Sequence, residues 1–273
     1  SRSYSSTILY STFQLARKYL HYYVTAASGK GHGIHSPFVF SFIKNILNDK
    51  RLDPGHAAFE ALRNKLLKDT RMIEVEDFGA GSSVIKSNKR KVGSMAATSL
   101  KPARFAKLLH RMAAAYQPAK MVELGTSFGI TSAYMASGNP AGKLFTFEGA
   151  PSVAEMAREH FRALGIKNIE LFEGDFNHTL PVFLNSNQQI DFVFIDGNHR
   201  KEPTLRYFSN LLENASRSCV FVFDDIHWST EMEEAWKEIQ QHDRVMLSID
   251  LFFIGIVYIN PDFKVKQHFK IRF

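Results

Sequence analysis

Residues 121–132 carry the feature that most constrains how this chain folds. A short apolar run leads to Glu123, a glycine-containing turn follows, and a helix-forming stretch begins directly after the turn. Gly125 allows a tight turn with positive φ, and Gly129 lets the backbone approach a ligand or the strand closely. The glycine spacing differs from the dinucleotide-binding pattern Gly-x-Gly-x-x-Gly. The layout predicts a strand end that offers a carboxylate and several free backbone N–H groups to a ligand.

From residue 121 onward, apolar stretches alternate with helix-forming stretches, which predicts an α/β fold with a doubly wound, mostly parallel sheet of seven strands. The expected strands are Met121–Leu124, Leu144–Glu148, Ile169–Phe172, Phe192–Ile195, Cys219–Phe223, Val245–Ile249 and Phe253–Ile259. The expected helices are Ile130–Ala136, Val153–Leu164, Thr204–Asn214 and Met232–Gln240. Because only a short turn separates the last two strands, we expect them to form an antiparallel hairpin at one edge of the sheet.

Residues 1–100 differ from the rest of the chain in charge. They hold 15 Lys and Arg against 7 Asp and Glu, whereas residues 101–273 hold 19 against 20. This asymmetry predicts a boundary near residue 100, with an α-helical N-terminal extension or cover before it and one α/β domain after it.

The pattern of the extension is mainly helical. We expect one helix with an apolar stripe at spacings of three and four, formed by Leu9, Phe13, Ala16, Leu20, Tyr23, Val24 and Ala27. Further helices are expected from Ser36-Pro37 through Leu47, over His56–Lys68 and over Pro102–Tyr116. The polar, basic stretch Ser82–Lys91 is expected to be a mobile loop.

Composition and hydropathy narrow the class of protein. The most apolar run, Leu251–Ile259, is too short to span a bilayer, and the N-terminus lacks a signal-peptide pattern. We therefore expect a cytoplasmic protein that does not bind a membrane. The one cysteine, Cys219, lies in an apolar run, which excludes a disulfide or a cysteine-based metal site within one chain.

Acidic residues stand where the expected parallel strands end. They are Glu123, Glu148, Asp175, Asp196 and the pair Asp224-Asp225. Each one alone is explained most simply as a helix cap or a solvated loop acid, but five such sites in register favour a ligand-binding edge. Glu148 can accept both hydroxyls of a ribose, and Asp175 beside Phe176 can hold the edge of an adenine.

From about residue 100 to residue 260, the chain resembles the class I S-adenosylmethionine (SAM)-dependent methyltransferases, in particular the small-molecule O-methyltransferases related to catechol and caffeoyl-CoA O-methyltransferases. The segments that carry the resemblance are Glu123–Thr131, Phe147–Gly149, Glu173–Asp175, Asp191–His199 and Phe223–Trp228. The resemblance implies a Rossmann-like methyltransferase fold with SAM as cofactor. It is specific for the fold and the cofactor and much less specific for the identity of the substrate.

The resemblance also implies which residues bind SAM. The turn after Glu123 would hold the methionine end, with the Thr131 hydroxyl on its carboxylate; Glu148 would bind the ribose, and the turn Gly174–Asn177 would lie at the adenine. The candidate cofactor-binding residues are Glu123, Gly125, Thr126, Ser127, Gly129, Thr131, Glu148, Gly149, Gly174, Asp175, Phe176 and Asp196.

In the catechol-type branch, an Asp at the fourth strand end and an Asp-Asn pair at the fifth bind a divalent cation. The matching residues are Asp196, Asp224 and Asp225, and Asp225 departs from the family's Asn. Oxygen ligands suit Mg²⁺ or Mn²⁺, which would hold the acceptor oxygen and favour its deprotonated form. The alternative is that Asp196 and Asp225 only cap loops or bind the methionine amino group.

The general base of catechol-type enzymes is a lysine three residues after the first metal-binding Asp. Here that position is His199, and an imidazole is well suited to accept a hydroxyl proton near neutral pH. His227, two residues after Asp225, is the alternative.

A second glycine-rich segment, Glu76–Ser82, matches the commoner methyltransferase glycine motif better than the segment at Glu123. It leads into the basic stretch that ends at Lys91, whereas a cofactor turn leads into an apolar-faced helix. We therefore interpret it as a turn of the N-terminal region.

These observations predict a SAM-dependent methyltransferase that acts on a small hydroxylated acceptor with the help of a divalent cation. One alternative is an RNA methyltransferase whose basic N-terminal third contacts phosphates. The chain lacks an Asn/Asp-Pro-Pro-aromatic motif after the fourth strand, which argues against base N-methylation. The other alternative is a catalytically silent cofactor-binding module. A homodimer is compatible with the sequence. The sequence does not identify the methyl acceptor.

Overall fold

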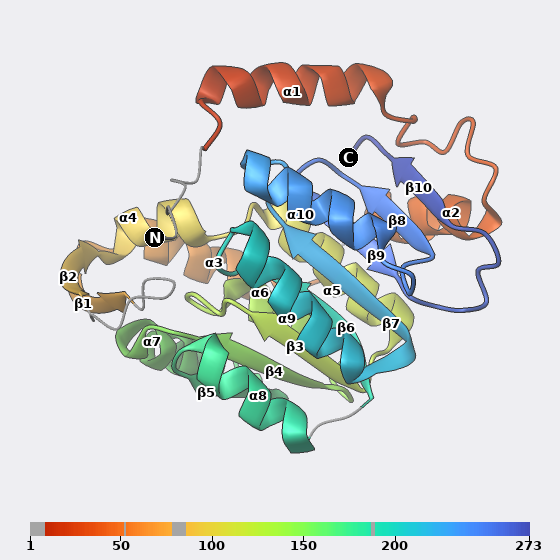
Figure 1. Ribbon diagram of the computed structural model, residues 1–273. Coiled ribbons are helices and arrows are strands. Elements are labelled where there is room, and N and C mark those ends of the chain that lie inside the picture. The colour runs from red at the N-terminus through yellow and green to blue at the C-terminus, as the bar shows by residue number, and fades with distance from the viewer. Residues whose placement is uncertain (1–8, 52, 78–85, 187–188) are drawn as a thin grey trace, which may run out of the picture. The chain divides into compact units, whose positions relative to one another are not determined.

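The computed structural model of the chain describes residues 9–51, 53–77, 86–186 and 189–273 (Figure 1). Two compact units form, one from Ser1–Asn48 and Asp191–Phe273 and the other from Asp49–Ile190. This division differs from the boundary predicted near residue 100, and a separate role for residues 1–100 stays a prediction. Among the described residues, no helix has both the length and the apolar character needed to cross a bilayer.

Three parallel strands organise the unit Asp49–Ile190. They are β3 (Lys120–Leu124), β4 (Lys143–Glu148) and β5 (Ile169–Glu173), in that order. Met121 pairs with Leu144, and Leu144 pairs with Ile169, so the carboxyl ends of the three strands share one edge. All three strands were predicted from their apolar runs.

The helices after these strands are α6 (Ile130–Gly138), α7 (Pro151–Ala163) and α8 (Phe176–Ser186). The sequence predicted α6 and α7 but not α8, which contains Pro181 in its interior. Packing compensates for the proline, because Phe183 of α8 lies 4.8 Å from Phe145 and 5.4 Å from Phe147 between ring centroids. Packing against an apolar surface therefore stabilises a helix that the local sequence pattern does not predict.

Residues 53–116 contribute helices α3 (His56–Leu67), α4 (Val92–Ser99) and α5 (Ala103–Tyr116) to the same unit. Strands β1 (Met72–Asp77) and β2 (Lys86–Lys91) pair antiparallel between α3 and α4. The prediction of a mobile loop is therefore wrong for Lys86–Lys91. Residues 78–82 of the second glycine motif lie outside the described residues.

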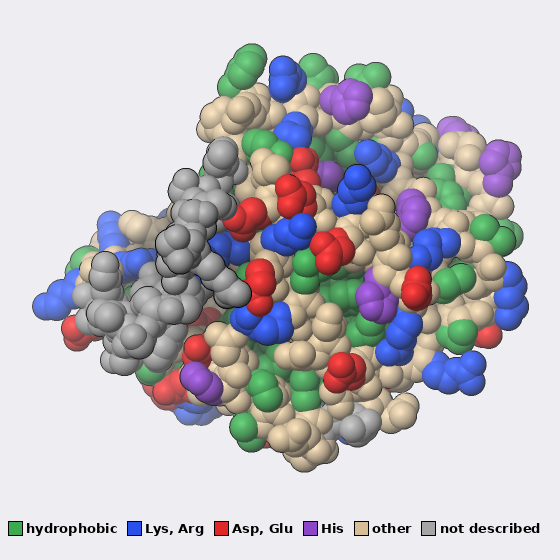
Figure 2. Space-filling model, viewed as in Figure 1, with side chains coloured by type: hydrophobic (Ala, Val, Ile, Leu, Met, Phe, Trp, Pro, Cys, Tyr) green, Lys and Arg blue, Asp and Glu red, His purple; other side chains and the backbone are tan. Residues whose placement is uncertain are grey.

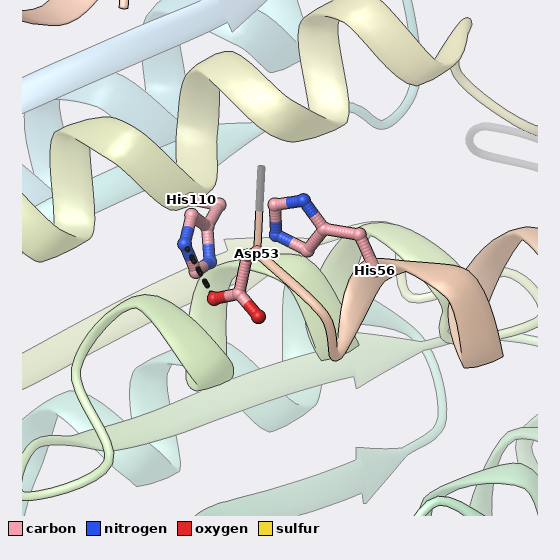
Figure 3. A group of neighbouring side chains, drawn as sticks. All are labelled: Asp53, His56 and His110. Atoms are coloured by element: carbon pink, nitrogen blue, oxygen red, sulfur yellow. Dashed lines mark ion pairs between the residues drawn. The ribbon is translucent and has the colours of Figure 1, made fainter. Parts of the chain in front are cut away.

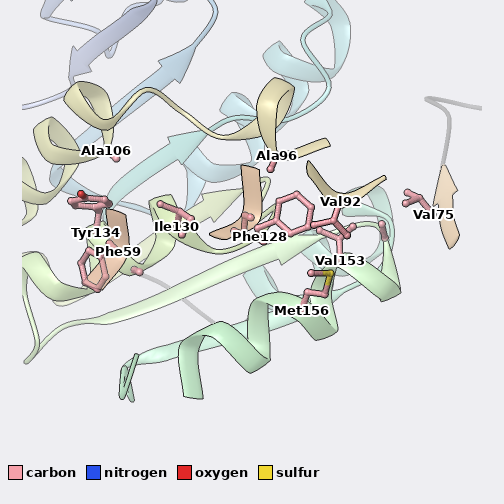
Figure 4. Close-up of a cluster of buried hydrophobic side chains, with 13 residues drawn as sticks. Phe59, Val75, Val92, Ala96, Ala106, Phe128, Ile130, Tyr134, Val153 and Met156 are labelled. Carbon is pink, nitrogen blue, oxygen red and sulfur yellow. The ribbon is translucent and has the colours of Figure 1, made fainter. Parts of the chain in front are cut away.

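One hydrophobic core joins these helices to the α/β part of the unit (Figure 4). Phe59 of α3 and Val92 and Ala96 of α4 pack in the same cluster as Phe128 and Tyr134. All five side chains are buried, and Phe59 and Tyr134 form an edge-to-face ring pair at 4.9 Å. Residues before 100 and after 120 thus share one core.

The unit formed by Ser1–Asn48 and Asp191–Phe273 holds five strands. They are β6 (Ile190–Ile195), β7 (Ala215–Asp224), β8 (Leu247–Asp250), β9 (Ile254–Tyr258) and β10 (Gln267–Lys270), in the order β10-β8-β9-β7-β6. Helices α9 (Lys201–Glu213) and α10 (Thr230–Gln241) lie where they were predicted.

The predicted antiparallel hairpin is confirmed as β8–β9, but it does not form the edge. β10 pairs parallel with β8 and lies beyond the hairpin, at the edge. Among the described residues, the sheet therefore has eight strands, β3 to β10, whereas seven were predicted. The sequence of β10, Gln267-His268-Phe269-Lys270, contains one apolar residue, and its side chains are only partly buried or exposed. A strand with so weak an apolar pattern gives no signal in the sequence.

Helix α1 (Thr12–Thr25) lies within the predicted range, but Leu9 and Ala27 of the predicted stripe fall outside it, and its buried face differs from that stripe. Phe13, Leu20 and Val24 of the stripe are 79%, 64% and 71% exposed. The buried face carries Tyr22 and Ala26, which pack with Phe252. The Tyr22 hydroxyl donates to the carbonyl of Ile271, so an amphipathic ring is buried with its polar end satisfied.

The next helix is also confirmed, in two parts: α2 (Pro37–Phe42) continues into a π-helical turn, Ile43–Leu47. As predicted, Ser36 caps it, with its hydroxyl oxygen accepting from Val39 N at 3.4 Å.

Candidate active site

Glu123, the last acid before the turn, is fully buried at the end of β3. Its Oε2 atom accepts hydrogen bonds from the hydroxyls of Ser132 and Thr146, the latter at 2.6 Å. Its Oε1 atom is buried and has no hydrogen-bond partner in the described part of the chain. Burial raises the pKa of Glu123 to about 7, against the two hydroxyl hydrogen bonds that lower it. The carboxyl therefore retains hydrogen-bonding capacity on one oxygen.

Four backbone N–H groups of the turn, those of Gly125, Thr126, Ser127 and Gly129, are engaged within the chain, whereas the sequence predicted free ones. Gly125 N and Thr126 N both donate to the carbonyl of Phe147 at 3.0 Å. Ser127 N donates to Glu148 Oε2 at 2.8 Å, and Gly129 N donates to the carbonyl of Thr126. The turn is thus preformed by hydrogen bonds within the chain.

Three residues of this turn have positive φ: Gly125 at 104°, Ser127 at 49° and Gly129 at 80°. A Cβ atom on Gly129 would lie 2.5 Å from Cε1 of Phe161 in α7. Gly129 is therefore required for the packing of α6 and α7, whereas the sequence suggested a close approach to a ligand or to the strand. Thr131 lies in the first turn of α6 and is 8% exposed.

Glu148 stands at the end of β4 and is partly exposed. Its Oε1 atom accepts from Ala150 N at 2.9 Å, and Gly149 N also bonds to the carboxylate. A carboxylate has about four acceptor sites, so these three bonds orient the group and leave it able to accept one further hydrogen bond. Burial raises the pKa of Glu148, while the backbone N–H groups lower it.

The third strand end is the turn after β5. Gly174 has φ 123° and donates from its N–H to the carbonyl of Glu148, which ties this turn to the end of β4. Asp175 Oδ1 accepts from Asn177 N at 2.9 Å at the start of α8, which begins at Phe176. Asp175 thus has the helix-capping role that is the simplest explanation of a strand-end acid.

Asp196, His199 and Asp224 come together at the ends of β6 and β7. One potential ligand atom from each lies within 4.8 Å of the others. His199 Nε2 lies 3.6 Å from Asp196 Oδ1, and Asp224 is 2% exposed. The group contains two of the three predicted metal ligands, with His199 in the place of Asp225. Asp225 has a positive φ of 53° and donates from its N–H to the carbonyl of Phe253.

His227 is held by two carboxylates. Its Nδ1 lies 3.0 Å from Glu233 Oε1, and its Nε2 lies 2.9 Å from Asp250 Oδ2. Burial lowers its pKa, but the hydrogen bonds to Asp250 and Glu233 outweigh burial and raise the pKa to about 9. An imidazolium with both nitrogens engaged has no lone pair for a substrate proton, so this geometry does not suit a general base.

A cleft of about 380 Å³ lies beside His227 within the same unit. Cationic or ionisable side chains dominate its lining, which includes Arg17, Lys18, His21, His227 and Lys270. The sequence did not indicate this cleft, because α1 and β10 lie at opposite ends of the chain.

The basic surplus of the chain does not form a continuous stripe on the face shown in Figure 2. Lys and Arg side chains there alternate with Asp and Glu side chains. Nucleic-acid-binding domains concentrate positive charge on one face or along one helix. The face shown has the mixed charge of an ordinary solvated surface.

The order of parallel strands, acid-ended turns and following helices is that of the class I methyltransferases. Residues 122–226 match a family model described as a methyltransferase domain. Over 122 residues, the chain is 32% identical to a catechol O-methyltransferase from Mycobacterium tuberculosis. This match covers 44% of the chain and 54% of that enzyme, so the chain spans about half the length of this curated relative.

Solved structures show the same fold. The SAH-bound methyltransferase PaMTH1 of Podospora anserina has a TM-score of 0.57 at 11% identity, covering 93% of this chain and 98% of the other. The O-methyltransferase of Bacillus cereus in complex with SAH has a TM-score of 0.55 at 18% identity, covering 81% and 97%. The predicted Rossmann-like methyltransferase fold is thereby confirmed.

Proposed function

We propose that this protein is a SAM-dependent O-methyltransferase that acts on a small hydroxylated acceptor. The observation that carries the proposal is the pair of acids at adjacent strand ends, Glu123 with its unpartnered Oε1 and Glu148 with its oriented carboxylate. The relatives described above support it, since one is named a catechol O-methyltransferase and the two solved structures contain SAH.

The residues present fit SAM as the cofactor. Glu148 keeps acceptor capacity for a ribose hydroxyl, and the turn between Gly125 and Gly129 is already formed by its own hydrogen bonds. Glu123 Oε1 offers a buried acceptor for a polar group or an ordered water at the methionine end. Thr131, Gly149, Gly174 and Phe176 complete the proposed site. Bound SAM would supply the methyl group for transfer.

The residues at the ends of β6 and β7 fit a divalent cation. Asp196 and Asp224 offer carboxylate oxygens, and His199 adds an imidazole nitrogen, a mixed set that Mn²⁺ accepts as well as oxygen-only sets. A bound cation would favour the deprotonated form of an acceptor hydroxyl. We propose Asp196 and Asp224 as its ligands, with Asp225 retained as a third candidate.

We propose His199 as the group that accepts the hydroxyl proton, at Nε2. Its side chain is 33% exposed, which leaves the ring accessible, and the Asp196 carboxylate 3.6 Å away stabilises the imidazolium that forms. The same lone pair cannot bind a metal and take a proton. The two roles of His199 are therefore exclusive, and experiment can separate them.

The test is calorimetry with SAM and SAH, followed by an SAH-release assay on catechols, other phenols and aliphatic alcohols with Mg²⁺ or Mn²⁺. We expect binding of both cofactor forms and turnover of at least one hydroxylated acceptor. Failure to bind either form would reject the proposal. Binding without turnover on any acceptor would favour a silent cofactor-binding module, and turnover only on RNA would favour a nucleic-acid methyltransferase.

A homodimer is the proposed assembly, with the exposed face of α1 as its contact. Phe13, Leu20 and Val24 give this face an apolar character that a second copy can bury. Light scattering on the wild type and on Leu20→Glu tests it. A monomer at all concentrations would contradict the proposal.

A further inference from the structure

A second group of metal-ligating side chains lies in the unit Asp49–Ile190 and shares no residue with the Asp196 group. Asp53 and His56 stand at the start of α3, and His110 comes from α5. One potential ligand atom from each lies within 4.8 Å of the others. Figure 3 shows the two imidazole rings against the Asp53 carboxylate.

The partners of His110 fix which of its nitrogens carries the proton. Nδ1 lies 3.1 Å from the carbonyl oxygen of Tyr134 and 3.0 Å from Ser137 Oγ, and the Ser137 hydroxyl itself donates to the same carbonyl. A carbonyl can only accept, so Nδ1 of His110 bears the hydrogen. Nε2 of the neutral ring therefore presents its lone pair, and it faces Asp53 Oδ2 at 3.4 Å.

Asp53 is oriented by its own turn. Its Oδ1 atom accepts from Gly55 N at 2.8 Å, and its backbone carbonyl accepts from His56 N at 3.0 Å. These two bonds leave Oδ2 directed at His110. The carboxylate is thus held in place before any ligand binds.

His56 completes the group with an atom that lacks a partner. Its Nε2 is buried and forms no hydrogen bond with any residue that the structure describes. The ring lies against His110, with centroids 4.4 Å apart and planes at 84°, and against Tyr134 at 4.6 Å. A buried nitrogen without a partner is costly unless something binds it.

Burial surrounds both imidazoles with low-dielectric protein. It lowers the pKa of His56 to about 4, with the Asp53 carboxylate acting in the opposite direction. Burial also lowers the pKa of His110. The neutral imidazole is the form that binds a metal ion.

The lone pair of His110 Nε2, the unpartnered Nε2 of His56 and the Asp53 carboxylate thus converge, and a cation among them would satisfy all three. We propose that Asp53, His56 and His110 bind a divalent transition-metal ion of the zinc class. Two imidazole nitrogens and one carboxylate oxygen suit Zn²⁺ better than Mg²⁺. The hydrogen bond from His110 Nδ1 to a backbone carbonyl is the outer-shell contact that fixes metal-binding histidines.

The ion would clamp the start of α3 to α5. Ligand atoms on a tetrahedral Zn²⁺ lie ~3.3 Å apart, so the three side chains need to close by no more than ~1.5 Å. The fourth position is open to water or to another ligand. The site is independent of the proposed methyl transfer.

The test uses tag-free, metal-stripped protein titrated with Co²⁺, whose visible absorption reports tetrahedral coordination, followed by Zn²⁺ competition. We expect one Co²⁺ equivalent with this absorption in the wild type, and at least tenfold weaker Zn²⁺ binding in His56→Asn and Asp53→Asn. His199→Asn, a change in the separate group of Asp196, His199 and Asp224, is the matched control and keeps the absorption.

A Co²⁺ spectrum that is unchanged in both variants, or lost in His199→Asn, would overturn the proposal. Imidazole ¹⁵N resonances of the wild type give a second readout that needs no variant. Zn²⁺ should shift Nε2 of His56 and His110 at one equivalent. Unshifted resonances at saturating Zn²⁺ would also overturn it.

Discussion

The Nε2 atom of His227 lies 2.9 Å from Oδ2 of Asp250, a carboxylate whose side chain is 2% exposed. Glu233 holds the other ring nitrogen at 3.0 Å, and Lys18 and Tyr10 bind Glu233 in turn. Glu233 belongs to α10, whereas Lys18 lies in α1. A charged network therefore ties the N-terminal helix to the sheet of its unit.

This network makes stability depend on pH. The pKa of His227 is about 9 in the folded state against 6.5 for an unperturbed histidine, so the stabilisation is full below pH 6.5 and is lost as pH rises through about 9. A shift of this size corresponds to on the order of 3 kcal/mol. Urea unfolding between pH 6.5 and 9.5 should show this loss in the wild type but not in His227→Gln. The control is His178→Gln, an exposed histidine, which should keep the wild-type slope.

Glu148→Ala should weaken SAH binding at least tenfold, because hydrogen bonds to a charged group contribute about 1.5–3 kcal/mol. Glu155→Ala is the matched control, since Glu155 is an exposed acid on α7. Calorimetry measures both affinities. Unchanged SAH affinity in a folded Glu148→Ala protein would remove Glu148 from the proposed cofactor site.

Activity should vanish in chelator and return with Mg²⁺ or Mn²⁺, if a cation orients the acceptor. Asp224→Asn should lose affinity for the added metal and keep its SAH affinity within about twofold. The reason is that the Asp224 carboxylate is proposed to bind the cation and not the cofactor. Metal titration and SAH calorimetry on the same sample separate the two effects. Full activity in chelator would reject the cation.

His199→Gln should lower turnover by roughly 100-fold, the contribution typical of general base catalysis, with SAH affinity unchanged. If His199 is the base, metal affinity stays and the acidic limb of the pH–rate profile disappears. If it is a ligand instead, metal affinity falls with turnover. Unaffected turnover would exclude both roles.

Gly129→Ala and Gly165→Ala separate backbone strain from steric overlap. Both glycines have positive φ, 80° and 69°, which costs an alanine about 1–2 kcal/mol. Only at position 129 does the new Cβ overlap Phe161, at 2.5 Å, whereas nothing lies within 4 Å at position 165. In chemical unfolding, we expect Gly129→Ala to lower the free energy of unfolding by about 1–3 kcal/mol more than Gly165→Ala does. Equal losses would contradict the packing role of Gly129.

The α/β part of the fold could be predicted because its signals are local. The strands from Met121 to Ile195 are mostly apolar, and each has an acid at or near its end that the sequence shows directly. Elements held by tertiary packing gave no such signal. Helix α8 depends on Phe183 against β4, and β2 is a strand of charged and polar residues that pairs with β1.

The candidate site was predictable in its residue types but not in its contacts. The sequence placed Asp196, His199 and Asp224 near one another, since β6 and β7 end there. It could not show that Ser127 N is engaged by Glu148, or that Asp250 pairs with the histidine at 227. Nor could it join Asp53 to His110, because their proximity depends on the packing of α3 and α5.

The contact between Tyr22 and Ile271 also sets an order of events during synthesis. The two residues are 249 positions apart, and Ala27 pairs with the same C-terminal segment. At ~5–20 residues per second, α1 leaves the ribosome on the order of 10–50 s before its partner strand is made. Residues 49–190 can fold within that interval, whereas the aromatic face of α1 stays exposed to solvent until its partner has been synthesised. A chain that stalls or is cleaved before residue 271 would leave this helix as a ready target for chaperones and proteases.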